Sequence, residues 1–205
     1  MPIIFLIRHA ENDYVKQSRL AGRLPDIHLN EKGRMQAKAL AERLKDLSLK
    51  VIYSSPLDRA METAGFIAEA KKINIIAREG LLETDYGEWQ GKTLKSLRRR
   101  KLWRTVQNAP SMARFPGGES FAECQIRVIS EIEALRNQHK PKDMFACVFH
   151  ADPIKLAVAY YLGMPLDNFQ RLSVAPASVT ALHISDSGSH LMTLNYDISL
   201  NFPKS

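Results

Sequence analysis

The sequence has few cysteines and no long apolar run. Only two of its 205 residues are cysteine, Cys124 and Cys147, which excludes a disulfide framework and a cysteine zinc site. Both lie in apolar patterns, and we expect them to be buried free thiols. No stretch approaches the roughly 18 apolar residues that a membrane-spanning helix needs, so we expect no membrane partner.

A secretory signal and internal linkers are also missing. The apolar start at residues 3–7 is too short for a signal-peptide core and meets Arg8 immediately, so we expect a soluble, cytoplasmic protein. No Gly-, Ser- or Pro-rich linker, low-complexity tract or internal repeat divides the chain. Its 45% hydrophobic and 25% charged residues are typical of a globular protein. We therefore expect residues 1–205 to form a single domain.

Acidic residues are absent from the segment KSLRRRKLWR, residues 95–104. This basic segment holds six cations of a chain whose formal charge is +7, so the remaining residues are nearly neutral together. Its local field favours anionic partners, although a charge run is usually a solvated face. A basic cluster with an interleaved tryptophan, here Trp103, can also bind RNA. One short patch makes a nucleic-acid partner the weaker interpretation.

The pattern of apolar residues predicts an α/β fold. Short apolar runs predict four buried strands, at residues 3–7, 50–56, 73–77 and 144–149. Apolar residues at helical spacing predict four helices, at residues 30–47, 58–70, 120–135 and 152–163. A hairpin follows, with strands at 179–185 and 190–196 around a turn at 186–189. The alternation predicts a three-layer sandwich: a mostly parallel central sheet, helices on both faces, and antiparallel pairing near the C-terminus.

Polar side chains follow the ends of the four predicted strands. Arg8 and His9 follow the first, Arg59 the second, Glu83 the third and His150 the fourth. Because parallel strands end at one edge of a sheet, these side chains are expected to surround one cleft. Two histidines and a carboxylate also form a known zinc-binding set, and that alternative stays open. The fixed positive charges of Arg8 and Arg59 would repel a zinc dication, which weakens this alternative.

Five motifs carry a resemblance to a known family. They are RHAEN (8–12), SSPLDRAMETA (54–64), LLETDYGEWQG (81–91), PGGES (116–120) and FHAD (149–152). Together and in this order they resemble the histidine phosphatase superfamily, which includes the phosphoglycerate mutase-like phosphatases. The resemblance implies that His9 is the phosphorylated nucleophile and Glu83 the general acid. It also implies that Arg8, Arg59 and His150 form the phosphate pocket, with no metal and no other cofactor.

The chemistry of these residue types suits a small anionic phosphorylated substrate. Guanidinium groups match phosphate oxygens with forks of donors. His9 must be neutral to attack phosphorus, and neighbouring cations favour the neutral imidazole. Glu83 must be protonated to protonate the leaving alkoxide, and can then take a proton from water.

The chain departs from the family pattern at three places. Ala10 stands where the family usually has glycine after the nucleophile, and Val15 where it has an asparagine. Asp152, in the last motif, stands where many members have glycine. Because Pro153 and a predicted helix follow, we interpret Asp152 as an N-cap of backbone N–H groups.

Two further residues match the loop behind the nucleophile in the family. Arg19 and Gly22 are candidates for substrate binding. The alternative, a solvated arginine and a turn glycine, carries about equal weight. In relatives, the stretch that holds the basic segment covers the mouth of the active site. Its arginines would then select a polyanionic substrate, with Leu102 and Trp103 as an apolar wall.

Three functions compete. Residues 92–120 form a shorter insertion than is typical of the cofactor-dependent phosphoglycerate mutases. A shorter cover admits water, so we favour a phosphatase over a mutase-type phosphotransferase. A phosphate- or RNA-binding protein without catalysis is the third hypothesis. The sequence leaves the physiological substrate and the oligomeric state open.

Overall fold

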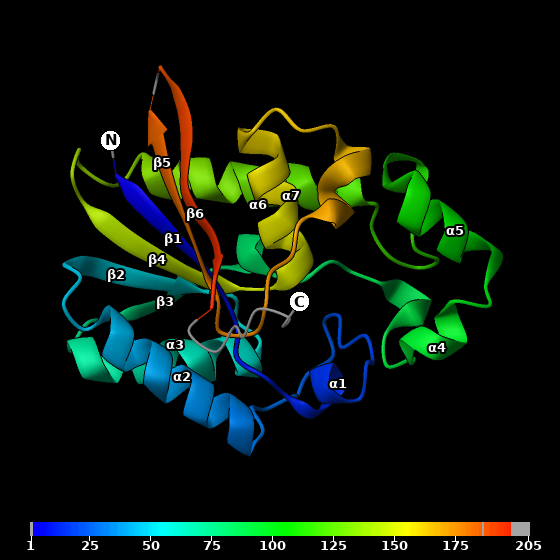
Figure 1. Cartoon of the computed structure of the whole chain (residues 1–205), viewed down its shortest axis with the longest axis horizontal. Coiled ribbons are helices and arrows are strands. Elements are labelled where there is room, and N and C mark those ends of the chain that lie inside the picture. Colours follow the sequence, from blue (N-terminus) through cyan, green and yellow to red (C-terminus); the bar gives the residue numbers. More distant parts are fainter. Residues whose placement is uncertain (1, 186, 198–205) are drawn as a thin grey trace, which may run out of the picture.

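A computed structural model describes residues 2–185 and 187–197 of the chain. A six-stranded sheet in the order β3-β2-β4-β1-β5-β6 forms its centre (Figure 1). The strands are β1 (Ile3–Arg8), β2 (Leu49–Ser54), β3 (Ile75–Ala77), β4 (Met144–Phe149), β5 (Val179–Ser185) and β6 (Gly188–Tyr196). All four buried strands and both hairpin strands predicted from the sequence are present. Position 186, in the predicted turn, lies outside the described residues.

The pairing of the strands confirms the predicted topology. β4 lies between β1 and β2 and is parallel to both, and β3 is parallel to β2. β5 runs antiparallel to β1 and to β6, which gives the C-terminal antiparallel pairing. β3 is shorter than predicted because only Ile75, Ile76 and Ala77 find partners on β2.

Helices cover both faces of the sheet, as predicted. They are α2 (Glu31–Leu44) and α3 (Asp58–Lys71) on one face, and α6 (Phe121–Arg136) and α7 (Ala151–Tyr161) on the other. Side chains of β1 alternate between the faces. Ile4 and Leu6 pack in the core beneath α6 and α7, whereas Ile7 packs in the core beneath α2 and α3. The result is the predicted three-layer sandwich.

Local sequence explains where the long helices begin. Asn30 caps α2 by accepting from Gly33 N at 2.8 Å, and Ser120 and Glu123 form a reciprocal capping box at the start of α6. The predicted start of α7 is wrong. His150 is its N-cap residue, and Asp152 lies inside the first turn with no capping hydrogen bond.

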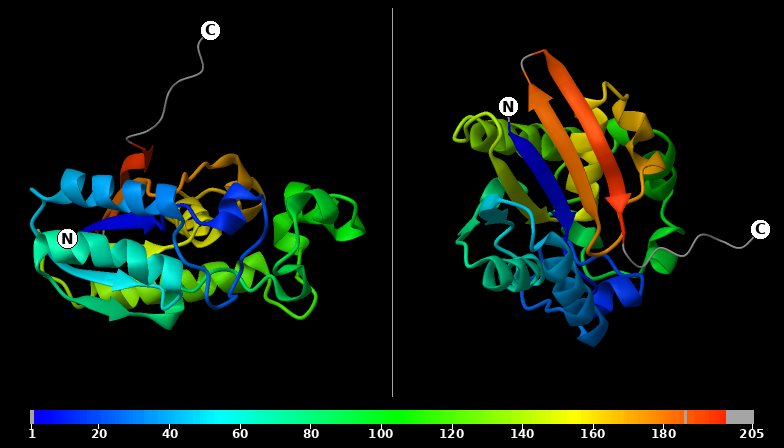
Figure 2. Two further views of the ribbon diagram at one scale, coloured as in Figure 1. Left: turned by 90° about the horizontal axis from the view of Figure 1, so that it is seen from below. Right: turned by 60° about the vertical axis from the view of Figure 1, so that its left-hand side comes forward.

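A third hydrophobic core, separate from the two that cover the faces of the sheet, lies beyond the end of the sheet. It contains α4 (Leu94–Leu97) and α5 (Lys101–Asn108), which Figures 1 and 2 show to one side of the strands. Three short helices complete it: η2 (Gly87–Trp89), η3 (Pro110–Met112) and η4 (Leu166–Arg171). Two others lie elsewhere: η1 (Glu79–Leu81) packs in the core beneath α6 and α7, and α1 (Asp13–Lys16) has no buried residue. Its core is aromatic, with Trp89, Phe115, Phe121 and Phe169 buried together. The sequence predicted none of these short elements.

Two predictions, one from the scarcity of cysteine and one from the absence of a long apolar run, can be compared with the structure. Cys124 and Cys147 are both buried and free, as expected. Within residues 2–185 and 187–197, none of the helices combines the length and the apolar character needed to cross a bilayer.

Candidate active site

Two neighbouring parallel strands, β1 and β4, carry the two histidines. Arg8 ends β1 and His9 follows it, while His150 follows β4. The His9 backbone N–H donates to Phe149 O at 2.9 Å, which extends the pairing of the two strands by one residue. The imidazole centroids of His9 and His150 are consequently 5.2 Å apart, in an edge-to-face arrangement.

The other predicted residues come to the same edge of the sheet. Arg59 lies in the first turn of α3, is only 1% exposed, and donates from Nη2 to Gly22 O at 2.6 Å. Glu83 follows η1 and is 8% exposed. A cavity of about 160 Å³, which we call the phosphate cavity, is lined by Arg8, His9, Arg19, Gly22, Arg59 and Glu83, among others. The strand ends therefore meet as expected.

The His9 imidazole has one nitrogen free for chemistry. Its Nδ1 lies 2.7 Å from Ala10 O. A carbonyl oxygen only accepts hydrogen bonds, so Nδ1 carries the proton and Nε2 keeps its lone pair in the neutral ring. Burial, reinforced by the charges of Arg59 and Arg8, holds the pKa of His9 well below its ordinary value. The ring is therefore a neutral base with Nε2 unoccupied.

Ser55 determines the tautomer of His150, a role that the sequence did not reveal. The two residues interact between Ser55 Oγ and His150 Nε2 at 2.8 Å. Ser55 Oγ accepts from Leu57 N at 3.4 Å, and His150 Nε2 is the one acceptor that the described residues offer to the Ser55 hydroxyl, so we assign its proton to the bond with Nε2. His150 Nδ1 then carries a proton, and it has no hydrogen-bond partner. His150 is fully buried beside His9.

Several buried donors around the phosphate cavity lack partners. Arg8 Nε, Asn12 Nδ2, Arg59 Nε and Arg59 Nη1 belong to residues of the cavity wall. His150 is not among the wall residues, but its unpartnered Nδ1 lies on the ring that contacts His9. A buried donor without an acceptor costs about 1–3 kcal/mol, and more when the group is charged. Their gathering beside one cavity is best explained by an anion that accepts from several of them at once.

The Glu83 loop is held by two arginines. Arg23 Nε donates to Glu83 O at 2.9 Å, and Arg127 Nη1 donates to Leu82 O at 2.9 Å. Glu119 of the PGGES motif pairs with both arginines, at 3.1 and 2.8 Å. This clamp fixes the backbone from which the Glu83 side chain enters the cavity. Neither arginine was singled out from the sequence, because each acts through distant main chain.

The Glu83 carboxyl is adjusted for proton transfer near neutral pH. Burial, followed by the negative charge of Asp152, raises its pKa to about 7. The Thr84 N–H, which donates to Glu83 Oε1 at 2.8 Å, and the charges of Arg59 and Arg8 act in the opposite direction. Near pH 7 the group is thus present in both protonation states, as a general acid and base requires.

Asp152 lies on the wall of the phosphate cavity, and its prediction as an N-cap is wrong. The N-cap of α7 is His150, two residues before the predicted one, so Asp152 lies in the first turn of the helix. Its Oδ2 accepts from the Tyr86 hydroxyl at 2.7 Å, and its Oδ1 pairs with Lys155 Nζ at 2.6 Å. Burial opposes ionisation, but Lys155 and Tyr86 outweigh it and lower the pKa of Asp152.

Arg19 and Gly22 both line the phosphate cavity, and both also have structural contacts. The Arg19 guanidinium donates twice to Gly91 O, at 3.0 and 2.8 Å, and lies over the Tyr14 ring. Gly22 has φ +56°, and a Cβ there would lie 2.3 Å from Gln90 Oε1. Glycine is therefore favoured at this turn, whatever the residue contributes to binding.

The two remaining departures from the family pattern differ in whether they line the phosphate cavity. Ala10 is fully buried in the core beneath α2 and α3, and it is absent from the cavity wall. Val15 does line the cavity, where it supplies an apolar surface.

The zinc alternative fits the geometry poorly. Among the described residues, one trio of metal-ligating side chains has donor atoms within 4.8 Å of one another, namely Asp26, His28 and Asp58. That trio excludes His9, His150 and Glu83. In addition, His9 Nδ1 and His150 Nε2 are engaged by Ala10 and Ser55.

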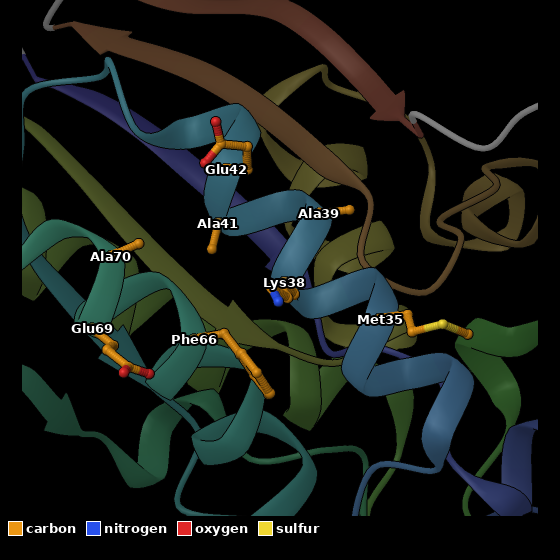
Figure 3. Close-up of a pocket in the computed structure, with 8 residues that line it drawn as sticks. All are labelled: Met35, Lys38, Ala39, Ala41, Glu42, Phe66, Glu69 and Ala70. Carbon is orange, nitrogen blue, oxygen red and sulfur yellow. The ribbon is translucent and has the colours of Figure 1, made fainter.

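A larger groove of about 750 Å³ runs between α2 and α3 (Figure 3). Alanine, Met35 and Phe66 side chains line it together with Lys38, Glu42 and Glu69. None of the predicted site residues reaches it, so size alone does not identify the chemical site.

Comparison with known proteins decides the family. The profile of the histidine phosphatase superfamily (branch 1) matches residues 4–197. The chain belongs to the histidine phosphatase superfamily. Both the family and the fold predicted from the sequence are thereby confirmed.

Relatives within the superfamily include phosphatases and mutases. Phosphoserine phosphatase 1 of Hydrogenobacter thermophilus is 34% identical over 194 residues, which cover 94% of this chain and 91% of the relative. A 2,3-bisphosphoglycerate-dependent phosphoglycerate mutase of Thermoplasma acidophilum is 29% identical, over 90% of this chain and 88% of the relative. The structure of Bacillus stearothermophilus YhfR superposes with a TM-score of 0.89 and 28% identity, covering 97% and 98% of the two chains. These findings support the prediction of a phosphoric monoester hydrolase.

Proposed function

We propose that this protein hydrolyses small phosphomonoesters through a phosphohistidine on His9 Nε2. The observation that carries the proposal is the set of unpartnered buried donors on Arg8, Arg59 and His150 around a neutral imidazole. A bound phosphoryl group supplies oxygens for these donors and stands next to the free nitrogen. Glu83 lines the same cavity and serves as the proton donor.

The first step transfers the phosphoryl group to the enzyme. The Nε2 lone pair of His9 attacks phosphorus, and the bond from phosphorus to the ester oxygen breaks. The electron pair of that bond goes to the leaving oxygen, which takes a proton from Glu83. Arg8, Arg59 and His150 stabilise the charge on the other phosphoryl oxygens.

The second step releases phosphate. Water attacks the phosphohistidine, the bond between nitrogen and phosphorus breaks, and its electron pair returns to His9. The ionised Glu83 takes a proton from the attacking water and is ready for the next cycle. His9 needs no external proton in either step, because Nδ1 keeps its proton on Ala10 O.

Hydrolysis is the proposed outcome rather than transfer to a second substrate. The short insertion at residues 92–120 supports water access, whereas the mutase relative keeps phosphotransfer as the second candidate. The 34% identical relative is called a phosphoserine phosphatase, so phosphoserine belongs in the substrate panel. A single domain and a cytoplasmic location remain part of this proposal.

The decisive assay measures phosphate release from a panel of phosphomonoesters in the presence of a chelator. Wild type, His9→Ala and Glu83→Gln are compared, with acid-stable and acid-labile phosphoprotein measured in parallel. We expect turnover and an acid-labile phosphoprotein in wild type, no phosphoprotein in His9→Ala, and a loss of about 100-fold or more in Glu83→Gln with alkyl esters. Equal turnover in all three would refute the scheme, and salt-sensitive RNA binding that survives His9→Ala would favour the RNA alternative.

A further inference from the structure

A second cavity adjoins the phosphate cavity. It has a volume of about 300 Å³ and shares Leu20, Tyr86 and Asp152 with the smaller cavity. We call it the aromatic cavity, because Trp89, Trp103, Phe115 and Phe121 lie in its wall. The shared residues place the two cavities side by side.

The wall of the aromatic cavity suits a flat apolar group. Trp89, Phe115 and Phe121 are each about 1% exposed, so their ring positions are fixed by the surrounding core. Trp103, on α5, stacks nearly parallel to Trp89 with centroids 6.2 Å apart. Trp103 and Leu94 are half-buried, so these two wall residues present the apolar surface that a ring can cover, with the buried rings behind them.

The junction between the two cavities offers hydrogen-bond acceptors and negative charge. Each Asp152 oxygen accepts one hydrogen bond, from Tyr86 or from Lys155, and keeps a further lone pair. The Tyr86 hydroxyl proton is committed to Asp152, so the Tyr86 oxygen also presents a lone pair. A hydroxyl or amine on the substrate is favoured at this point, and a carboxylate is repelled.

We infer that the substrate is a phosphomonoester with a hydrogen-bond donor near the phosphate and a flat, largely apolar ring beyond it. The phosphate occupies the phosphate cavity, the donor faces Asp152, and the ring enters the aromatic cavity. This inference rests on the proposed function. It separates the protein from relatives that act on phosphorylated hydroxy acids, because Asp152 opposes their carboxylate.

The basic segment fits this arrangement at one position. Arg98 lies in the outer wall of the aromatic cavity and is exposed, so its charge attracts a phosphate dianion to the mouth. Trp103 lies in the wall as expected, whereas Leu102 packs against the aromatic core behind it. The segment thus combines an attracting charge with an apolar surface.

The first experiment measures binding without catalysis. Trp89 and Trp103 are the two tryptophans of the chain, so their fluorescence reports occupancy of the aromatic cavity. Benzylphosphonate and methylphosphonate, which resist hydrolysis, are titrated against the whole protein. We expect benzylphosphonate to change the emission and to bind about tenfold or more tightly than methylphosphonate. Equal affinities would overturn the inference.

Matched variants assign that preference to the aromatic cavity. Trp103→Ala removes a wall residue and is expected to remove most of the preference, with Trp89 as the remaining reporter. Leu94→Ala, on α4, tests the wall from a second element. Lys101→Ala changes the same helix as Trp103 at an exposed position outside the wall, and should leave the preference unchanged. A preference retained in both wall variants would contradict the assignment.

The second experiment compares two substrates that differ in one group. In 2-hydroxy-2-phenylethyl phosphate, a phenyl ring replaces the carboxylate of 3-phosphoglycerate. We expect kcat/KM of wild type to be about tenfold or more higher for the phenyl compound. Asp152→Asn should narrow the ratio by raising kcat/KM for 3-phosphoglycerate relative to that for the phenyl compound, and Trp103→Ala should narrow it by lowering kcat/KM for the phenyl compound.

The outcomes separate the inference from the proposed function. If kcat/KM is higher for 3-phosphoglycerate, the proposed phosphatase function stands and the inferred substrate class is overturned. Absence of turnover and of phosphoprotein for every ester overturns the proposed function, and the phosphonate titration still decides whether the aromatic cavity binds rings.

Discussion

The pH dependence of the reaction should depend on Asp152. Burial and, to a smaller extent, the carboxylate of Asp152 raise the pKa of Glu83 from 4.5 to about 7, which corresponds to about 3 kcal/mol against ionisation. Asp152→Asn keeps the shape of the side chain and removes its charge. Ionisation of Glu83 then becomes easier, so its pKa falls. Because burial is the larger cause, we expect a fall of about one unit and a pKa that stays above 4.5.

The expected change in rate follows from the protonated fraction of Glu83. With a pKa near 7, kcat/KM for an alkyl phosphate should fall about tenfold for each pH unit above neutrality, since only the protonated form acts as the acid. In Asp152→Asn the alkaline limb should begin about one unit lower. Activity near pH 5.5 should then change little, while activity near pH 7.5 should fall severalfold. His9 adds no ionisation above neutrality, because its pKa is already lowered.

The measurement is a full profile of kcat/KM against pH for both proteins. Glu88→Gln is the matched control, because it removes the same charge from an exposed position outside both cavities. A p-nitrophenyl ester provides a second control, since its leaving group needs little help from an acid during phosphorylation of His9. An alkaline limb that stays in place or moves to higher pH in Asp152→Asn would refute the reasoning.

Three further predictions concern positioning and stability. Ser55→Ala frees the His150 ring to change tautomer and leaves buried His150 Nε2 without its partner, so kcat/KM should fall about tenfold or more and the free energy of unfolding by about 1–3 kcal/mol, as steady-state kinetics and urea denaturation will show. Gly22→Ala places a Cβ against Gln90 at positive φ and should lower the free energy of unfolding by about 1–3 kcal/mol in urea denaturation, a loss that trimming Gln90 to alanine should only partly restore. Ile132→Ala, in the fully buried core beneath α6, should cost about 2–5 kcal/mol by the same measurement, and a cost near zero would contradict that burial.

Much of the fold was predictable because its signals are local. The run at residues 3–7 is apolar on both faces, as a central strand between β4 and β5 must be. The capping box formed by Ser120 and Glu123 spans only four residues and marks the start of α6. α4 and α5 were missed because they are short and their apolar residues pack on an aromatic core assembled from distant segments, although Thr93 caps α4 by accepting from Ser96 N at 3.2 Å.

The candidate site was predictable in composition and less so in detail. Arg8, His9, Arg59, Glu83 and His150 follow strand ends or stand close to them, so topology alone brings them together. The role of Asp152 was mispredicted, because the N-cap of α7 lies two residues before the predicted one.

The sequence by itself determined the family, the sheet and the residues that meet at its edge, since apolar periodicity and strand ends are properties of neighbouring residues. Only the tertiary structure decided which protons and lone pairs face the cavity. The tautomer of His150 depends on Ser55, which is 95 positions away, and the pKa of Glu83 depends on Asp152. The aromatic cavity likewise needs side chains from several elements. Such long-range contacts leave no periodic trace in the chain, because they follow from how the layers pack.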